Sequence, residues 1–589
     1  MFAKVTRCKT PPRNETGYAL LVTLGFLGIM LILLASVVAW TSNESGMTAR
    51  NNLYNSSVAA AEAATEMVIA QMDRDFVYQS VNADLDQYRN LTPGPLQGDW
   101  PVTFEFSDGS GNAGQTGVIS LGPAVVTNLN SQFAGLYGLV APYRVTAQAR
   151  ALNQLYNASA AVCQDIQLAS LPVFQFAIFY TMNLEINPGP AMIITGKVHS
   201  NGNIYTAPVS NLEYRDYVTY SGAIFNNRDP SDPQYGSAKV APVYVHSTSN
   251  PAQAGGLTLP VGVDNSPASV QQILEPPPFG EDPDSQLGQQ RYYNKADLIV
   301  TTTNGAVRVT TGAWDNFAPV AADVTNGSVT SYSFLDTSKS FIDYRENKTT
   351  ITTEIDVGAF KSWMAVPNKG GALNGLVQSL TGHQLDSVYV QDQRLSPGKL
   401  TVVRVVNGAA LPANGLTVAT KLPLYVKGNF NLNNGDTSAG QTNTSKTKPA
   451  SLAGDAITIL SQNWKDDYLA NSTASGRGAA NTTVNAALLS GIVPTCTNHY
   501  SGGVENFPRF LENWNNLALT YNGSMVVMFN SRYATNFWKS PDNNNYYTAP
   551  DRRWAFDVNF LDQAKLPPGT PQVRKLVRGQ WNIVGASGG

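Results

Sequence analysis

Four charged side chains near the C-terminus are of the types that could act on a polysaccharide. Glu505, Asp551, Arg553 and Asp557 all lie among aromatic residues. Enzymes that cleave glycosidic bonds use paired carboxylates, so the fold would have to bring these residues together on one face. The chain has no G-x-S-x-G elbow, P-loop or metal-binding motif. Structural stacking explains the same composition, and we expect a protein that is not an enzyme and binds no cofactor.

The spacing of the 4 histidines matches no catalytic or metal-binding pattern. His199 lies in "VHSNG", a corner rich in Gly and Asn, where we expect a turn-stabilising or half-buried histidine and not a base. His246, His383 and His499 have no evident partners in the sequence. No metal site is therefore predicted.

The 3 cysteines are too few for a disulfide framework. Cys8 precedes the long apolar segment near the N-terminus, and Cys163 and Cys496 follow it. These two could form one long-range disulfide, or both could remain free, buried thiols. The sequence leaves both alternatives open.

The composition indicates a turn-rich chain with few charges. At 589 residues it is long enough for roughly two to four domains. Only 14% of its residues are charged, and 49 glycines and 34 prolines indicate many turns. The net charge of -3 supplies no basic surface, so we do not expect nucleic acid as a partner.

The first element that must position all of these groups is an uncharged segment from Gly17 to Trp40. As a helix it would be about 36 Å long, enough to cross a hydrocarbon core of roughly 30 Å. It is longer than the apolar part of a secretory signal, and no cleavage site of small residues follows it. Basic residues precede it, so we expect a cytoplasmic N-terminus, a single membrane pass and a periplasmic or extracellular body.

We expect this helix to continue to Phe76, because no proline interrupts the chain before that residue. Apolar residues recur at spacings of three and four, which gives the second half one apolar face. Gly25 and Gly28 would leave a notch for the close approach of another helix. Four residues are expected to lie against a small sheet that follows: Val58, Ala61, Val68 and Met72.

The junction of Gly17 with the aromatic Tyr18, between a basic leader and a long apolar helix, resembles a prepilin peptidase site. The stretch "LYNSSVAAAEAATEMVIAQM" is similar to the helix of PilX-type minor pilins. This resemblance implies cleavage after Gly17, an inner-membrane location, and two kinds of partner, namely prepilin peptidase and other pilin or pseudopilin subunits.

Major pilins of that family carry a glutamate five residues into the mature chain, whereas Val22 stands there in this sequence. A carboxylate at that depth is costly without a partner charge. The departure implies a minor or tip-type subunit. The chain as a whole resembles a group of large bacterial proteins that carry a pilus-assembly N-terminus on a β-rich body.

We expect an α+β fold with a long N-terminal transmembrane and pilin-like helix, a small antiparallel sheet and a large, mainly β body. Alternation in "YRVTAQARAL" and "NASAAVCQDIQLAS" predicts the small sheet. Short apolar runs that end in Gly, Asn or Ser, at irregular spacing, favour a β-solenoid over a sandwich for the body. The expected parts are a leader (1–17), the helix (18–76), a small β domain (96–170) and a large domain (171–589), with a loop at 247–290 and a helix-containing insertion at about 340–400.

Together these features predict a non-catalytic minor, assembly or tip-associated subunit of a type IV pilus or a related pseudopilus. A membrane-anchored cell-surface adhesin or stalk outside any filament fits the same sequence. An anchored β-solenoid enzyme that acts on polysaccharides is a second alternative. The sequence identifies no surface ligand.

Overall fold

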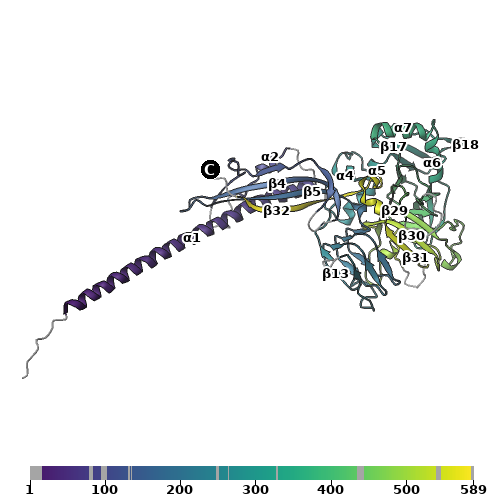
Figure 1. The fold of residues 1–589 in the computed structure, drawn as a ribbon. Helices are drawn as coiled ribbons and strands as arrows, with labels where there is room; N and C mark the ends of the chain where they lie inside the picture. The colour runs from purple at the N-terminus through teal and green to yellow at the C-terminus, as the bar shows by residue number, and fades with distance from the viewer. Residues whose placement is uncertain are drawn as a thin grey trace, which may run out of the picture.

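The structure is a computed structural model that describes residues 16–78, 84–94, 103–129, 133, 135–246, 251–262, 264–326, 329–433, 443–538 and 546–584. Residues 1–15 of the expected leader, which include Cys8, and the start of the expected small β domain lie outside this set. Figure 1 shows a long helix, a sheet along the second half of that helix, and a large β-rich body beyond the sheet.

Helix α1 (Thr16–Tyr78) is continuous over 63 residues, or about 95 Å. Between Tyr18 and Asn52 its residues are exposed, except for the half-buried Gly28 and Gly46. From Ser57 onward, buried residues recur at spacings of one, three and four, which places them on one face of the helix. The helix therefore has an exposed first half and a packed second half.

The packed half of α1 lies along a six-stranded antiparallel sheet of order β1–β4–β5–β32, in which β2 and β3 also pair with β4. The long hairpin β4–β5 forms its centre, and Arg150 pairs with Ser159 beside the connecting turn. The strands are β1 (Phe104–Ser107), β2 (Gly117–Ser120), β3 (Val125–Asn128), β4 (Tyr137–Ala151), β5 (Ser159–Pro172) and β32 (Gln572–Val584).

The C-terminal strand β32 belongs to this sheet, which corrects its assignment to the large domain. It pairs antiparallel with β5 from Gln572 opposite Pro172 to Val584 opposite Ala161. Because an unpaired strand edge is open to association, this pairing protects β5 along most of its length. The range 96–170 is thus incomplete as a unit without the last strand of the chain.

The first part of the body consists of short parallel strands that repeat every 20 residues. Ile178 pairs with Val198 and Val198 pairs with Val218, so equivalent residues stack with this spacing. A second stack pairs Leu184 with Ile204 in the same way. The three stacks are β6 (Ile178–Tyr180), β9 (Val198–Ser200), β12 (Val218–Tyr220) and β15 (Ala252–Gln253); β7 (Leu184–Ile186), β10 (Ile204–Thr206) and β13 (Ile224–Phe225); and β8 (Met192–Ile194), β11 (Leu212–Tyr214) and β14 (Val243–Tyr244).

Strand β6 also pairs with β30, which joins the first stack to a 12-stranded sheet. Strands β29 and β30 are buried along almost their whole length, as is usual for parallel strands covered on both faces. The further strands of this sheet are β16 (Leu298–Thr302), β17 (Val307–Thr311), β23 (Ser387–Asp392), β25 (Leu416–Thr420), β27 (Ala450–Gly454), β29 (Thr482–Ile492), β30 (Ala518–Asn530) and β31 (Asp551–Phe556). A separate six-stranded sheet contains β20 (Leu335–Asp336), β21 (Ile342–Asp343), β22 (Lys348–Asp356), β24 (Lys399–Val406), β26 (Leu424–Lys427) and β28 (Ile457–Leu460), and β18 (Val324–Asn326) pairs with β19 (Val329–Ser331).

Two expected segments differ from the structure. The range 247–290 is not a plain loop, because Ser266 and Ser285 cap short helices by accepting backbone hydrogen bonds. The range 340–400 contains helices but is not an insertion, because β22 and β23 within it belong to the two large sheets. The helices of these regions are α3 (Pro267–Gln271), α4 (Gln286–Gln290), α5 (Tyr292–Lys295), α6 (Val357–Ala365) and α7 (Gly370–Thr381), and α2 (Asp86–Arg89) follows α1.

Candidate functional site

The first half of α1 is a continuous apolar surface without a partner in the folded chain. Its large apolar side chains between Tyr18 and Trp40 are exposed by 43% at Val22 to 77% at Tyr18. Among the described residues, α1 alone is long and apolar enough to cross a membrane, with a mean hydropathy of 2.7 in its most apolar window. Soluble monomers rarely expose so large an apolar surface, so this surface indicates a membrane or a protein partner.

The serine and threonine hydroxyl groups between Tyr18 and Thr41 are satisfied within the helix. Thr23 Oγ1 donates to the carbonyl of Ala19 at 2.9 Å, and Ser36 Oγ donates to that of Ile32 at 2.7 Å. The Thr41 hydroxyl makes the equivalent bond at 2.8 Å. None of these groups needs water, which lowers the cost of placing the segment in a lipid or protein environment.

The expected helix-packing glycines lie on the exposed half of α1. A Cβ atom added at Gly25 or Gly28 would meet no atom within 4 Å, so the notch is open in the single chain. The expected processing site, Gly17–Tyr18, lies at the start of the same helix. Both roles stay predictions, because each requires a second protein.

The second half of α1 packs on the sheet through the residues that the sequence singled out. Ala61, Val68 and Met72 have no exposed surface, and Val58 is half-buried. The sheet packs two groups of apolar side chains on this face of α1. Those around Val68 and Met72 are Val118, Val145, Ile166, Leu168 and Leu576, and those around Ala61 are Phe106, Ala147, Ala149 and Val162.

Strand β32 ties the C-terminus to α1 by polar contacts as well. Arg578 makes two hydrogen bonds to the Glu66 carboxylate, one of them at 2.7 Å. Arg574 donates to the backbone carbonyl of Phe76 at 2.8 Å. The packed half of α1 is therefore held by strands from both ends of the sequence.

The structure does not combine the four charged residues near the C-terminus into one site. Of their hydrogen bonds and ion pairs among the described residues, only the exposed pair Arg553–Asp551, at 2.9 Å, joins two of them. Glu505 is buried and accepts from the Tyr500 hydroxyl at 3.1 Å. Asp557 is buried and accepts from Thr444 Oγ1 at 2.7 Å. Their separate partners indicate structural roles.

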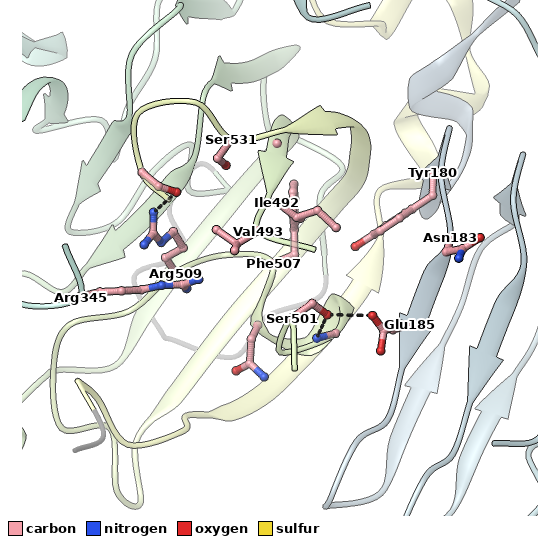
Figure 2. Close-up of a pocket in the computed structure, with 14 residues that line it drawn as sticks. Tyr180, Asn183, Glu185, Arg345, Ile492, Val493, Ser501, Phe507, Arg509 and Ser531 are labelled. Carbon is pink, nitrogen blue, oxygen red and sulfur yellow. Dashed lines mark hydrogen bonds between the residues drawn. The ribbon is translucent and has the colours of Figure 1, made fainter. Parts of the chain in front are cut away.

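A small cavity lies between the first strands of the body and the segment after β29 (Figure 2). Glu185 is at one wall, where its Oε1 atom accepts hydrogen bonds from Ser501 Oγ at 3.2 Å and from Thr495 Oγ1. Arg345 and Arg509 line the cavity as well. Its volume of about 20 Å³ leaves room for one or two water molecules, which is too little for a sugar.

Burial raises the pKa of Glu185 to about 7. The unfolded chain releases this proton near its ordinary value of 4.5, so stability should fall as pH rises from 4.5 to 7, by up to about 3 kcal/mol, and then level off. Glu185→Gln should remove this part of the pH dependence in equilibrium urea unfolding at pH 5 and pH 7.5. Glu512, whose pKa burial also raises to about 7, keeps its own contribution.

The exposed Glu105, which pairs with Arg150 at 2.5 Å, provides the matched control. Glu105→Gln should leave the pH dependence of the parent unchanged. Equal slopes for Glu185→Gln and the parent would contradict a buried, protonated Glu185.

His199 is a structural residue in the folded chain. It is fully buried, with Nδ1 at 2.8 Å from Thr219 Oγ1 and Nε2 at 2.9 Å from Asn201 Oδ1. Loss of solvation lowers its pKa to about 4, so the ring is neutral at physiological pH. A buried neutral imidazole with both nitrogens engaged is not available as a base.

The other three histidines have partners, contrary to expectation. The His246 ring lies edge-on to Tyr217 with centroids 4.1 Å apart, and His499 stacks on Phe537 at 3.7 Å. His383 lies beside Asp386, three residues further along the chain, and beside Asp297, which is distant in the sequence. Sequence reasoning missed this cluster, for which the His-x-x-Asp spacing in "GHQLD" was the local signal.

Cys163 and Cys496 are free thiols in the structure, so the disulfide that the sequence left open is not formed. Cys163 is half-buried on β5, where it pairs with Thr146 and Asn582. Cys496 is exposed near the small cavity and bonds to His499 through its backbone. Cys163 lies on a strand of the sheet beside α1, whereas Cys496 lies in the segment after β29, and neither thiol is fully buried.

The chain matches no protein-family model and no curated protein. Among solved structures it is similar to the competence-associated pilin ComZ from Thermus thermophilus, with a TM-score of 0.28 and 12% sequence identity. That match covers 90% of this chain and 97% of the other. A superposition this loose leaves the function to be inferred from the residues of the chain itself.

Proposed function

We propose that this chain is a minor, assembly or tip-associated subunit of a type IV pilus or a related pseudopilus, with no catalytic activity of its own. The observation that carries the proposal is the division of α1 into an exposed apolar half and a half packed on a sheet. The exposed half is suited both to a bilayer and to the apolar surface of other helices. A subunit that leaves the membrane for a filament needs one helix that serves in both places.

The residue at the fifth mature position supports a subunit present in few copies. Val22 is apolar and 43% exposed, so the helix can insert without a partner charge at that depth. The large body lies beyond the end of α1 that is opposite Tyr18 (Figure 1). A body of this size opposes close helical repetition but is compatible with a place at the tip.

The proposal includes a β-solenoid as the architecture of the body. The 20-residue spacing of parallel strands in three stacks supports it, because each coil then lies directly on the one before. A sandwich built from hairpins would instead pair strands that follow each other in antiparallel order. The body would extend outward from the inner membrane, with the N-terminus in the cytoplasm, where prepilin peptidase cuts. Other pilin subunits would then recruit the helix from the membrane.

Intact-mass analysis of membrane-extracted protein tests the processing step. The parent chain should begin at Tyr18, whereas Gly17→Val should retain the leader, because a bulky side chain replaces the small residue before the cut. Gly25→Val is the matched control, since it places the same side chain at an open position of the same helix. It should be processed like the parent.

Fractionation of sheared filaments then distinguishes a pilus subunit from the alternative, an anchored adhesin or stalk outside any filament. The parent should occur at low copy number in filaments or in pilus-assembly complexes, and Gly17→Val should be absent from both. A parent chain that keeps Met1, or that is processed yet stays out of both fractions, would favour an anchored adhesin or stalk.

A further inference from the structure

The topology of the body brings two aspartates and a histidine together near one end of the 12-stranded sheet. Asp297 directly precedes β16, and Asp386 directly precedes β23. These strands are parallel neighbours, with Leu298 opposite Val388, so the two aspartates lie side by side at the amino ends of their strands. His383 reaches them from the turn that ends α7, where Gly382 adopts a left-handed conformation. Ligand atoms of the three side chains lie within 4.8 Å of one another.

The hydrogen bonds of Asp297 leave one of its oxygens for a ligand. Its Oδ2 atom accepts from the backbone amides of Asp386 and Ser387 at 2.9 and 3.2 Å, and from Ser387 Oγ at 3.0 Å. Its Oδ1 atom lies 3.9 Å from His383 Nε2, which is too far for a hydrogen bond. The carboxylate is thus fixed in orientation while Oδ1 points to the ring.

In the neutral ring, the contacts of His383 leave its Nε2 atom with a free lone pair. Nδ1 lies 2.9 Å from the backbone carbonyl of Gln384, which assigns the ring proton to Nδ1. Such a bond from one ring nitrogen is the usual arrangement when the other nitrogen binds a metal. A lone pair on Nε2 that faces a carboxylate oxygen is suited to binding a cation between them.

Asp386 supplies an independent observation. The residue is only 7% exposed, and its Oδ1 atom is buried without a hydrogen-bond partner. Its Oδ2 atom lies 3.5 Å from His383 Nδ1. Within the part of the chain that the structure describes, His383 alone makes an ion-pair contact with either aspartate. Burial of carboxylate oxygens without compensation is costly, and a bound cation would provide it.

A cavity of about 680 Å³ gives this cluster access to solvent. His383, Asp386 and Ser387 line it together with Lys448 and Gly569. The cavity provides an entry path for an ion and space for water molecules on it. It is far larger than the cavity in Figure 2.

We propose that Asp297, His383 and Asp386 bind one divalent transition-metal ion of the Zn²⁺ or Mn²⁺ kind. The ligands are Nε2 of His383 and one oxygen from each aspartate, and the remaining positions face the cavity. One imidazole with two carboxylates suits these ions, whereas Ca²⁺ prefers six to eight oxygens. Ligands about 2.1 Å from a tetrahedral ion lie about 3.4 Å apart, so the 3.9 Å separation of Nε2 and Oδ1 has only to close slightly.

Calorimetric titration of the full chain with ZnCl₂, in detergent and without a polyhistidine tag, tests the site. The parent should bind one equivalent, and His383→Gln and Asp386→Asn should each weaken that binding at least tenfold. His246→Gln is the matched control, because this exposed histidine lies against Tyr217 and away from the cluster. It should bind like the parent.

Circular dichroism and thermal unfolding in metal-free buffer show whether each variant is folded. Asp386→Asn should be at least as stable as the parent there, because a neutral amide replaces one of two adjacent buried carboxyl groups. Unchanged stability with weaker metal binding distinguishes a ligand role from a purely structural one. The proposal is overturned if the parent binds no stoichiometric Zn²⁺ or Mn²⁺, if folded His383→Gln binds as tightly as the parent, or if only CaCl₂ saturates the site. None of these outcomes depends on assembly into a pilus.

Discussion

Val68→Asp is expected to lower the free energy of unfolding of the α1–sheet unit by about 3–5 kcal/mol. Val68 has no exposed surface, and the sheet and the helix surround it with apolar side chains. The aspartate would be buried without a partner charge, so it must either lose its solvation or force α1 away from the sheet.

Met67 provides the matched control, because it is the preceding residue on the same helix and is 43% exposed. Met67→Asp should cost less than about 0.5 kcal/mol, as is usual for surface substitutions. Hydrogen exchange of the detergent-solubilised chain, followed on peptides from α1, β4 and β5, measures the loss locally. Equal protection in Val68→Asp and Met67→Asp would contradict the packing of α1 on the sheet.

Glu346→Gln is expected to destabilise the body by about 3 kcal/mol, because it removes the charge partner of a buried arginine. The Glu346 and Arg509 side chains are 1% and 6% exposed and form a direct ion pair. Glu346 Oε2 also accepts from the backbone amides of Thr535 and Asn536 at 3.1 Å each. Arg345 is buried nearby, and burial together with the Arg509 charge lowers its pKa to about 9. Without the carboxylate, two guanidinium groups would share one poorly solvated region (Figure 2).

The exposed pair of Glu66 and Arg578 is the matched control for this change. Its side chains are 39% and 48% exposed, so Glu66→Gln should cost no more than about 1 kcal/mol. The buried Trp464 and Trp514 make intrinsic fluorescence a suitable probe of body unfolding in urea. A loss for Glu346→Gln no larger than that for Glu66→Gln would show that the buried charges are not coupled as the structure indicates.

Local signals in the sequence were enough for the helix and the central hairpin. The absence of proline and the spacing of apolar residues specify α1, because these properties act within a few turns. The alternation on both sides of a polar turn specifies β4 and β5 in the same way. The burial of Ala61, Val68 and Met72 follows from the helix face alone once a sheet is present.

The repeat in the body was missed because its strands are too short to show alternation. Strands β6, β9 and β12 have three residues each, so a period of two cannot be recognised within them. Their 20-residue spacing becomes visible only through the parallel pairing of each strand with the next. Strand β15 also continues this stack by pairing with β12, although a longer segment separates the two strands in the sequence.

The sequence by itself therefore determined the apolar helix, its packed face and the β-rich character of the body, because each depends on neighbours along the chain. Only the tertiary structure decided that β32 completes the sheet around α1 and that Asp297 meets His383. It also decided that Cys163 and Cys496 remain apart as free thiols. These contacts join residues that are far apart in sequence, and such pairing is selected by the shape and burial of the whole fold and not by local periodicity.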